Sequence, residues 1–344
     1  MLDNEIEITL GELTKLPQNS YILADMRGET AFGHGHIEGA VLHQVDSEYT
    51  KERTLIFYCQ YGKQSIETAE GYRSRGYDAY SLSGGYKEWL ISRYDSLGSS
   101  ELERYDRQMI LPQIGAHGQE QLKNARVLMI GAGGLGCPCG MYLAAAGVGK
   151  IGIVDFDSVA LSNMNRQVAH RELGINKAVS LSNALRGIND SIEVTAYPYA
   201  FSSENAAGLL SGYDFVIDCA DSPQSKFLIN DMCVQNNKPY CYGGVIGFEG
   251  QVMTVIPHKS ACLRCIFDEP PASCQTCETY GIIGAAAGVI GCVQALEAIK
   301  YITSAGSILS GRMFIFDMLT MKSRIVHLGN MSTECDICSG TAHK

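Results

Sequence analysis

The sequence Val127-Leu-Met-Ile-Gly-Ala-Gly-Gly-Leu-Gly136 sets the architecture of most of this 344-residue chain. It joins an apolar run, typical of a buried strand, to Gly131, Gly133, Gly134 and Gly136, and an apolar helical pattern follows. Such glycines allow a tight turn and let phosphates approach the free N–H groups at the start of the next helix. The sequence therefore predicts a strand, a glycine loop and a helix that bind a nucleotide.

The segments around this loop repeat the alternation of strand and helix. We expect helices over 101–124 and 135–146, and strands over 126–130, 151–154, 192–195 and 215–217. This rhythm predicts a Rossmann-like, doubly wound α/β sheet whose ligands lie beyond the carboxyl ends of the strands. Residues 281–299 form the longest apolar stretch, but Gln294 and Glu297 favour a buried core helix over a membrane span.

Polar residues follow the strand expected over 151–154. Asp155 ends that strand, where an acidic residue commonly holds ribose hydroxyls, and Asp157 follows it. Asn163, Arg166 and Gln167 come next. A nicotinamide site needs no such cluster, whereas a triphosphate does, because phosphoryl chemistry depends on charge neutralisation and positioning. The cluster favours ATP over a dinucleotide.

Two further residues extend this set. Lys177 adds a positive charge, and Asp221 follows the strand expected over 215–217. That position places Asp221 at the same edge of the sheet as the glycine loop, and its carboxylate suits Mg²⁺.

The first third of the chain has its own alternation of short apolar runs and helical stretches, which predicts a small α/β domain with a mainly parallel sheet. Asp95-Ser-Leu-Gly-Ser-Ser100 reads as a linker. We therefore expect domains over 1–97 and 98–344. In the first, Cys59 opens the loop Cys59-Gln-Tyr-Gly-Lys-Gln-Ser65 between a strand and a helix, where N–H groups can stabilise a thiolate and a persulfide.

Two CxxC pairs lie in the second domain. Four thiolates from Cys262, Cys265, Cys335 and Cys338 fit a structural, tetrahedral zinc site. A redox dithiol or a pair of disulfides is the alternative, but two matching pairs favour the metal. Six other cysteines lie in apolar stretches and are expected to pack in the core: Cys137, Cys139, Cys219, Cys233, Cys241 and Cys292.

The composition limits the cellular compartment and the classes of partner that we expect. The formal net charge of −10 argues against binding to nucleic acid or to anionic membranes. The first 15 residues lack the pattern of a signal peptide, and 13 cysteines without such a signal point to metal or sulfur chemistry under reducing conditions. We expect a cytoplasmic protein.

Four motifs in order resemble the ThiF/MoeB/HesA family of adenylyltransferases, the bacterial relatives of ubiquitin-activating enzymes. They are Arg104-Tyr-Asp-Arg-Gln108, the glycine loop, the run from Asp155 to Gln167, and Asp218 to Asp221, and the resemblance covers about 101–340. It implies an ATP site in which Asp155 holds the ribose and Asp221 holds Mg²⁺. The phosphates would be held by Asn163, Arg166 and Lys177.

The same resemblance implies roles for residues outside the loop. Arg107 would reach into the ATP site of a neighbouring subunit, which implies a homodimer. Cys277 would take the activated acyl group or form an acyl-disulfide, with Cys274 as a near neighbour. Ser222 departs from the family, which often has Asn after the magnesium aspartate.

Residues 5–93 resemble the rhodanese family. The resemblance rests on Asp25-Met-Arg27, the run from Gly35 to Ala40, the Cys59 loop, and Ser83-Gly-Gly-Tyr-Lys-Glu-Trp89. It implies that Cys59 carries sulfur as a persulfide. Gln64 stands where the family commonly has Arg, and the sulfur donor stays open between thiosulfate and a cysteine desulfurase.

Together the two resemblances imply ATP-dependent adenylation of the Gly-Gly C-terminus of a ubiquitin-like sulfur-carrier protein, and then sulfur transfer from Cys59 to give a thiocarboxylate. One alternative is an adenylating enzyme that forms a thioester or an amide, with the rhodanese-like domain only recognising partners. A non-catalytic scaffold is another. A nicotinamide oxidoreductase is disfavoured by Arg166 and Lys177.

Overall fold

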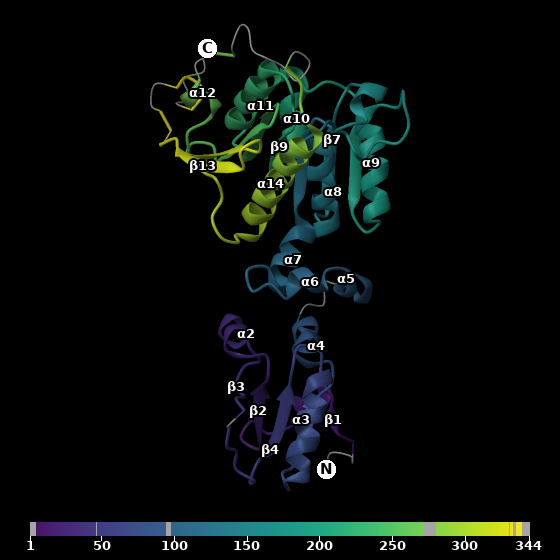
Figure 1. Cartoon of the computed structure of the whole chain (residues 1–344), viewed down its shortest axis with the longest axis vertical. Coiled ribbons are helices and arrows are strands. Elements are labelled where there is room, and N and C mark those ends of the chain that lie inside the picture. The colour runs from purple at the N-terminus through teal and green to yellow at the C-terminus, as the bar shows by residue number, and fades with distance from the viewer. Residues whose placement is uncertain are drawn as a thin grey trace. The chain divides into compact units, whose positions relative to one another are not determined.

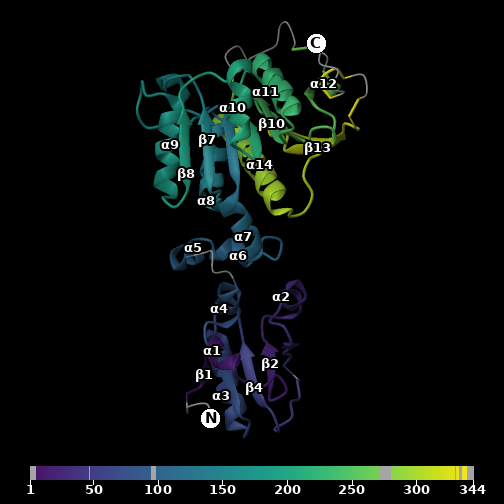
Figure 2. The same cartoon turned by 180° about the vertical axis from the view of Figure 1, so that it is seen from behind.

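The computed structural model describes residues 5–45, 47–93, 98–267, 269–270, 280–329, 331–332 and 335–338. The chain forms two compact units, Met1–His117 and Gly118–Lys344. Many of their elements are labelled in Figures 1 and 2. The domain boundary expected near residue 98 lies before the end of the first unit and stays a prediction.

The first unit contains a five-stranded sheet in the order β1-β5-β4-β2-β3, with every strand pair parallel. Its strands are β1 (Glu7–Ile8), β2 (Tyr21–Asp25), β3 (Val41–Leu42), β4 (Thr54–Tyr58) and β5 (Ala79–Leu82). The helices are α1 (Leu10–Leu13), α2 (Glu29–His34), α3 (Lys63–Ser74), α4 (Gly85–Ser92), α5 (Ser99–Arg104) and α6 (Asp106–Met109). The parallel α/β sheet predicted from the sequence is confirmed.

Strand β4 shows why this sheet is buried on both faces. Successive side chains of a strand point to opposite faces. Leu55 and Phe57 accordingly belong to one apolar cluster, and Ile56 and Tyr58 belong to the other. All four are fully buried, so the run reads as continuous rather than alternating hydrophobicity.

The second unit is built on an eight-stranded sheet in the order β13-β12-β11-β10-β9-β6-β7-β8. Strands β6 (Arg126–Ile130), β7 (Lys150–Val154), β8 (Glu193–Tyr197), β9 (Phe215–Asp218) and β10 (Tyr240–Ile246) are parallel. The antiparallel strands β11 (Glu249–Val255), β12 (Arg312–Asp317) and β13 (Lys322–His327) continue from β10. The chain order reverses between β6 and β9, and a crevice for ligands is expected there.

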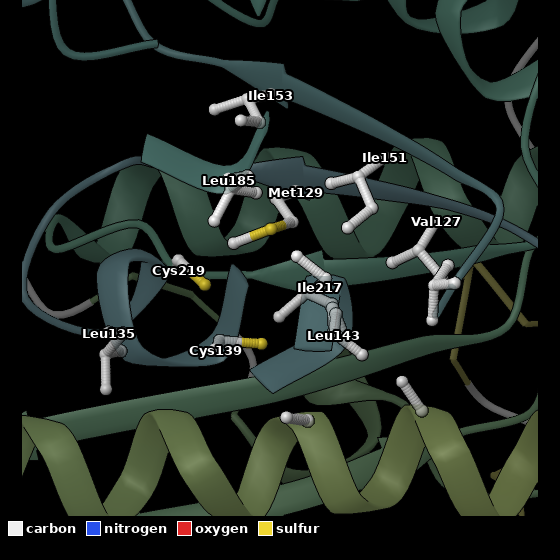
Figure 3. Close-up of a cluster of buried hydrophobic side chains, with 14 of the residues drawn as sticks. Val127, Met129, Leu135, Cys139, Leu143, Ile151, Ile153, Leu185, Ile217 and Cys219 are labelled. Atoms are coloured by element: carbon white, nitrogen blue, oxygen red, sulfur yellow. The ribbon is translucent and has the colours of Figure 1, made fainter. Parts of the chain in front are cut away.

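Helices cover both faces of this sheet, as a doubly wound fold requires. Helices α8 (Gly136–Ala146), α9 (Lys177–Ile188) and α14 (Gly284–Thr303) share one apolar cluster, part of which is drawn in Figure 3. Helices α10 (Ser203–Ser211) and α11 (Pro223–Gln235) contribute to the other cluster. The remaining helices are α7 (Gly115–Asn124), the short helix η1 (Leu161–Asn163) and α12 (Leu263–Ile266).

Helix α14 is long and apolar enough to cross a membrane by length and composition alone. Its polar side chains nevertheless find partners inside the protein. Gln294 is fully buried and donates to the carbonyl of Asp218 at 2.7 Å. Glu297 is also buried and accepts from Thr254 Oγ1 and from the N–H of Leu309. These bonds and the packing on α8 and β10 identify α14 as a core helix, as predicted.

Candidate functional site

Two glycines make the loop after β6 possible. Gly131 has φ +106°, and a Cβ there would lie 2.6 Å from the carbonyl oxygen of Cys219. A Cβ at Gly136 would lie 2.2 Å from the carbonyl oxygen of Gly131. Any side chain at either position would force the backbone apart, so these glycines bring the start of α8 against the ends of β6 and β9.

A cavity of about 380 Å³ opens at the carboxyl ends of β6, β7 and β9. Its position agrees with the crevice expected at the reversal of strand order. The residues in its wall that were predicted to bind nucleotide or magnesium are Gly131, Gly133, Gly134, Asp155, Asp157, Arg166 and Asp221. Apolar and aromatic side chains, including Phe156, Tyr199 and Phe201, line the remainder and could contact a base.

Asp155 joins the end of β7 to the glycine loop. Its Oδ2 accepts from the N–H of Ala132 at 2.7 Å, and its Oδ1 accepts from the N–H of Asp157 at 2.9 Å. Burial raises the pKa of the Asp155 carboxyl above its ordinary value, against the effect of these two N–H donors. The carboxylate is thus held in the wall by the loop itself.

Of the three residues predicted to bind phosphate, only Arg166 lines the cavity. Arg166 lines the cavity, and its Nη1 donates to the carbonyl of Ser162 at 2.8 Å. Lys177 is outside the wall, with Nζ 2.8 Å from Asp157 Oδ2. Asn163 is outside it as well, and its Oδ1 accepts from the N–H of Ala160 at 3.0 Å.

A buried ion pair at the cavity was not predicted. Lys226 of α11 lines the cavity, and its Nζ lies 3.2 Å from both carboxylate oxygens of Asp218 at the end of β9. Burial lowers the pKa of Lys226, but the Asp218 carboxylate outweighs it and the pKa is raised overall. Lys226 lies four residues after Ser222, whose hydroxyl caps α11 by accepting from the N–H of Ser225 at 3.1 Å. In the sequence, only the position of Lys226 one helical turn after Ser222, which follows the Asp218–Asp221 motif, could have suggested a role for this lysine.

One buried acceptor in the wall is open. Gln167 is 4% exposed, and its Oε1 has no hydrogen-bond partner within the described part of the chain. A buried acceptor without a donor is costly, so a ligand that donates a hydrogen bond there would be favoured. The ribose hydroxyls or the amino group of ATP supply such donors, so this acceptor suits a bound nucleotide.

Cys59 lies at the end of β4 in the first unit and is 3% exposed. Burial raises the pKa of its thiol, but hydrogen bonds from the Ser65 hydroxyl and from the N–H groups of Ser65, Tyr61 and Gln64 outweigh it, and the pKa is lowered overall. The Ser65 Oγ lies 3.6 Å from the sulfur. These donors would stabilise a thiolate or a persulfide at Cys59.

The glycines at positions 62, 84 and 85 close this loop. A Cβ on Gly85, whose φ is +62°, would lie 2.3 Å from the carbonyl oxygen of Cys59, and one on Gly62 would lie 2.8 Å from the N–H nitrogen of Gly84. The Ser83–Trp89 motif therefore packs its backbone directly on the Cys59 loop. Arg107 contacts the same loop, with Nη1 2.7 Å from the Tyr61 hydroxyl.

The four cysteines of the CxxC pairs come together in the second unit. Their sulfur atoms lie within 4.8 Å of one another, with separations of 3.8 Å for Cys262–Cys335, 3.8 Å for Cys262–Cys265 and 3.6 Å for Cys265–Cys338. Zinc–sulfur bonds of about 2.3 Å in a tetrahedron place sulfurs about 3.8 Å apart. A disulfide needs about 2.05 Å. The donor set fits Zn²⁺ and not disulfides.

Two of the predicted residues cannot be placed. Cys274 and Cys277 lie outside the described residues. Among the cysteines expected in the core, Cys292 is partly exposed and the other five are buried.

The comparison with known proteins agrees with this geometry. The chain is 40% identical over 293 residues to the adenylyltransferase and sulfurtransferase MOCS3-1 of Zea mays, covering 83% of this chain and 63% of that protein. It is 44% identical over 247 residues to MOCS3 of Arabidopsis thaliana, covering 70% and 53%. It is 44% identical over 248 residues to MOCS3 of Mus musculus, covering 71% and 54%. The chain thus spans between about half and two thirds of the length of these relatives.

Solved structures share the fold at lower identity. Escherichia coli MccB, in a crystal structure with succinimide, is 23% identical with a TM-score of 0.63, covering 72% of this chain and 76% of that one. The crystal structure of PaaA is 22% identical with a TM-score of 0.56, covering 68% and 76%.

The family models divide the chain in the order that the sequence predicted. Residues 9–92 match the rhodanese-like domain, and residues 105–337 match the ThiF family. The chain belongs to the ThiF family and carries a rhodanese-like domain ahead of the family region.

Proposed function

We propose that this chain adenylates the C-terminal glycine of a ubiquitin-like sulfur-carrier protein and then delivers sulfur to it from Cys59. The observation that carries the proposal is the presence, in one chain, of a glycine-loop cavity with charged walls and of a cysteine loop that lowers a thiol pKa. The relatives named adenylyltransferase and sulfurtransferase combine the same two activities in their names.

In the first step the carrier carboxylate attacks the α-phosphorus of ATP, and pyrophosphate leaves. A terminal carboxyl has a pKa of about 3.3 to 3.7 and is already ionised, so no general base is required. The chain's task is to neutralise charge. Arg166 in the cavity wall is placed to do so, and Lys177 could follow if it released Asp157.

Mg²⁺ would supply a further positive charge to offset the charge of the phosphates. Asp221 is exposed in the cavity wall, and its carboxylate is a suitable ligand for it. Asp155 is the candidate partner for the ribose, because its carboxylate is fixed at the end of β7. Arg107 stays our candidate for the ATP site of a second subunit.

In the second step the terminal sulfur of a Cys59 persulfide attacks the acyl-adenylate, and AMP leaves. The carrier is then joined to Cys59 through an acyl-disulfide. A second thiol must attack the Cys59 sulfur to release the thiocarboxylate, which leaves Cys59 in a mixed disulfide that another thiol reduces. Cys277 is a candidate for an acyl or acyl-disulfide intermediate. Thiosulfate or a cysteine desulfurase would reload Cys59.

Three other features support the assembly we propose. Helices α8 and α14 expose Tyr142, Val289 and Leu296, an apolar surface suited to a homodimer. The four-cysteine cluster suits a structural Zn²⁺. Free thiols within the described chain and the net charge of −10 suit a cytoplasmic protein that does not bind nucleic acid or membranes.

The test is intact-mass spectrometry of Gly-Gly carriers incubated with the full chain, Mg-ATP and a sulfur donor, beside a Cys59→Ala variant. The proposal expects the carrier to gain the mass difference between sulfur and oxygen, and the variant to stop at the adenylate. A thioester or amide product that forms equally with the variant would favour the alternative in which the rhodanese-like domain only recognises partners. No adenylate with any carrier would refute the proposal.

A further inference from the structure

The side chain of Tyr61 ties the Cys59 loop to helix α6. Its hydroxyl donates to Asp106 Oδ2 at 3.2 Å and accepts from Arg107 Nη1 at 2.7 Å. Asp106 also pairs with Lys87 Nζ at 3.3 Å, and its side chain is only 13% exposed. The phenol, the carboxylate and the two cations thus form one connected cluster within the first unit.

Apolar packing fixes α6 in this place. Leu90 and Ile91 of α4 pack against Leu102, Tyr105 and Met109, which are all buried. The space left between α4 and this segment is about 10 Å³, too small to admit more than one water molecule. The contact between Tyr61 and α6 is therefore supported by the apolar packing of α4 against the segment that contains α6.

Tyr61 also belongs to the ring of donors around the sulfur. Its backbone N–H is one of the groups that lower the pKa of the Cys59 thiol. The loop is held from the other side as well, because the N–H of Tyr86 donates to the Cys59 carbonyl at 2.9 Å and that of Lys87 donates to the Gln60 carbonyl at 3.0 Å. A movement of the Tyr61 side chain would carry an N–H donor away from the sulfur.

We propose that Tyr61, Asp106 and Arg107 are positioning residues for Cys59: α6 holds the loop in the conformation that stabilises the thiolate. The proposal extends the proposed function, since it concerns the residue that would carry sulfur there. It places Asp106 and Arg107, which lie ahead of the nucleotide-binding loop in sequence, at the sulfur site of their own chain, so an Arg107 that entered the ATP site of a second subunit would have to leave Tyr61.

The test measures how fast iodoacetamide alkylates Cys59 in the full chain as a function of pH, with peptide mass spectrometry to separate Cys59 from the other 12 cysteines. Tyr61→Phe keeps the ring and removes both hydrogen bonds. We expect it to move the alkylation midpoint up by about one pH unit, as loss of one hydrogen bond to a thiolate would. Arg107→Gln should move the midpoint in the same direction, and should add little to Tyr61→Phe because both break one cluster.

The matched control is Tyr21→Phe, because the Tyr21 hydroxyl makes no hydrogen bond to any residue that the structure describes. It should leave the midpoint at the wild-type value. An unchanged midpoint in both Tyr61→Phe and Arg107→Gln would overturn the proposal, as would an equal shift in the control.

A second readout separates this proposal from the proposed function. Thiosulfate loads Cys59 by transfer of its outer sulfur to the thiolate, which gives a persulfide and releases sulfite. Loading should be slower in Tyr61→Phe at neutral pH, by at most about tenfold for a midpoint shift of one pH unit, because a smaller fraction of the thiol is ionised. If the wild type took no sulfur from any donor while the midpoints shifted as expected, the sulfur function would fail and the positioning role would stand.

Discussion

Replacement of Lys226 by Met tests whether the buried pair with Asp218 has the strength that its geometry implies. The two side chains are 11% and 0% exposed and lie 3.2 Å apart. Opposite charges at that distance attract by about 5 kcal/mol at an effective dielectric constant of about 20. Removing one partner of such a pair leaves the other buried and uncompensated, which typically costs about 3 to 5 kcal/mol.

We therefore expect Lys226→Met to lower the free energy of unfolding of the second unit by about 3 to 5 kcal/mol. For a unit of this size the melting temperature should fall by about 6 to 20 °C. Differential scanning calorimetry measures the change, and the transition of the second unit is identified by its shift with Mg-ATP. The double variant Lys226→Met, Asp218→Asn should recover most of the loss, because no charge is left buried alone.

The stability difference between Lys226→Met and the wild type should also depend on pH. Burial already raises the pKa of Asp218 in the wild type against the effect of Lys226, and loss of the cation in Lys226→Met raises it further above the unfolded value. Protonated Asp218 is then favoured in the folded state, and the deficit relative to wild type should shrink as the pH falls through that raised pKa and be largest above it. A loss below about 1 kcal/mol, or a double variant no more stable than the single one, would refute the reasoning.

Three further predictions concern the other sites. Gly136→Ala should abolish nucleotide binding in a fluorescent-ATP titration, because the added Cβ would lie 2.2 Å from the Gly131 carbonyl oxygen. The control Gly187→Ala should bind normally, because a Cβ at that position meets nothing within 4 Å. Removal of the metal with a chelator should destabilise the second unit. The variant Cys265→Ser should contain less zinc than the wild type when zinc is measured with a colorimetric reagent. A wild-type zinc content below one per chain would contradict this prediction. The pH midpoint of Cys59 alkylation should lie below that of a free thiol. Ser65→Ala should raise this midpoint by about one pH unit, because the Ser65 hydroxyl contributes to the lowered pKa of the Cys59 thiol. An unchanged midpoint would argue against that hydrogen bond.

Much of the fold followed from local patterns in the sequence. The expected strand over 126–130 matches β6, and the helix expected over 135–146 begins one residue later in the structure, at Gly136. These elements were predictable because a continuous apolar run next to a glycine loop leaves few alternatives. The antiparallel strands β11 to β13 were not anticipated; β13 is exposed along its whole length and carries little hydrophobic signal, although β11 is mostly buried.

The composition of the cavity wall was predictable only in part. Gly131 and Asp155 directly follow a strand and Asp221 lies shortly after the end of β9, so all three could be placed where the carboxyl ends of parallel strands meet at one edge of the sheet. Gln167, which belongs to the polar cluster quoted from the sequence, also lines the wall, whereas Lys226 enters it from a helix interior, where sequence spacing does not say which way a side chain points.

Asn163 and Lys177 show why a motif does not by itself define a binding site. Both belong to the run of polar residues that suggested ATP, yet Asn163 closes the turn at Ala160 and Lys177 holds Asp157. A polar side chain near a loop can satisfy the backbone or neutralise a neighbour as readily as it can bind a phosphate. Asp157 is the link between these roles, because it lines the cavity while it pairs with Lys177. A phosphate that displaced Asp157 from Lys177 would bring the second cation into the site, so the phosphate contact that we propose for Lys177 requires its observed pair with Asp157 to break.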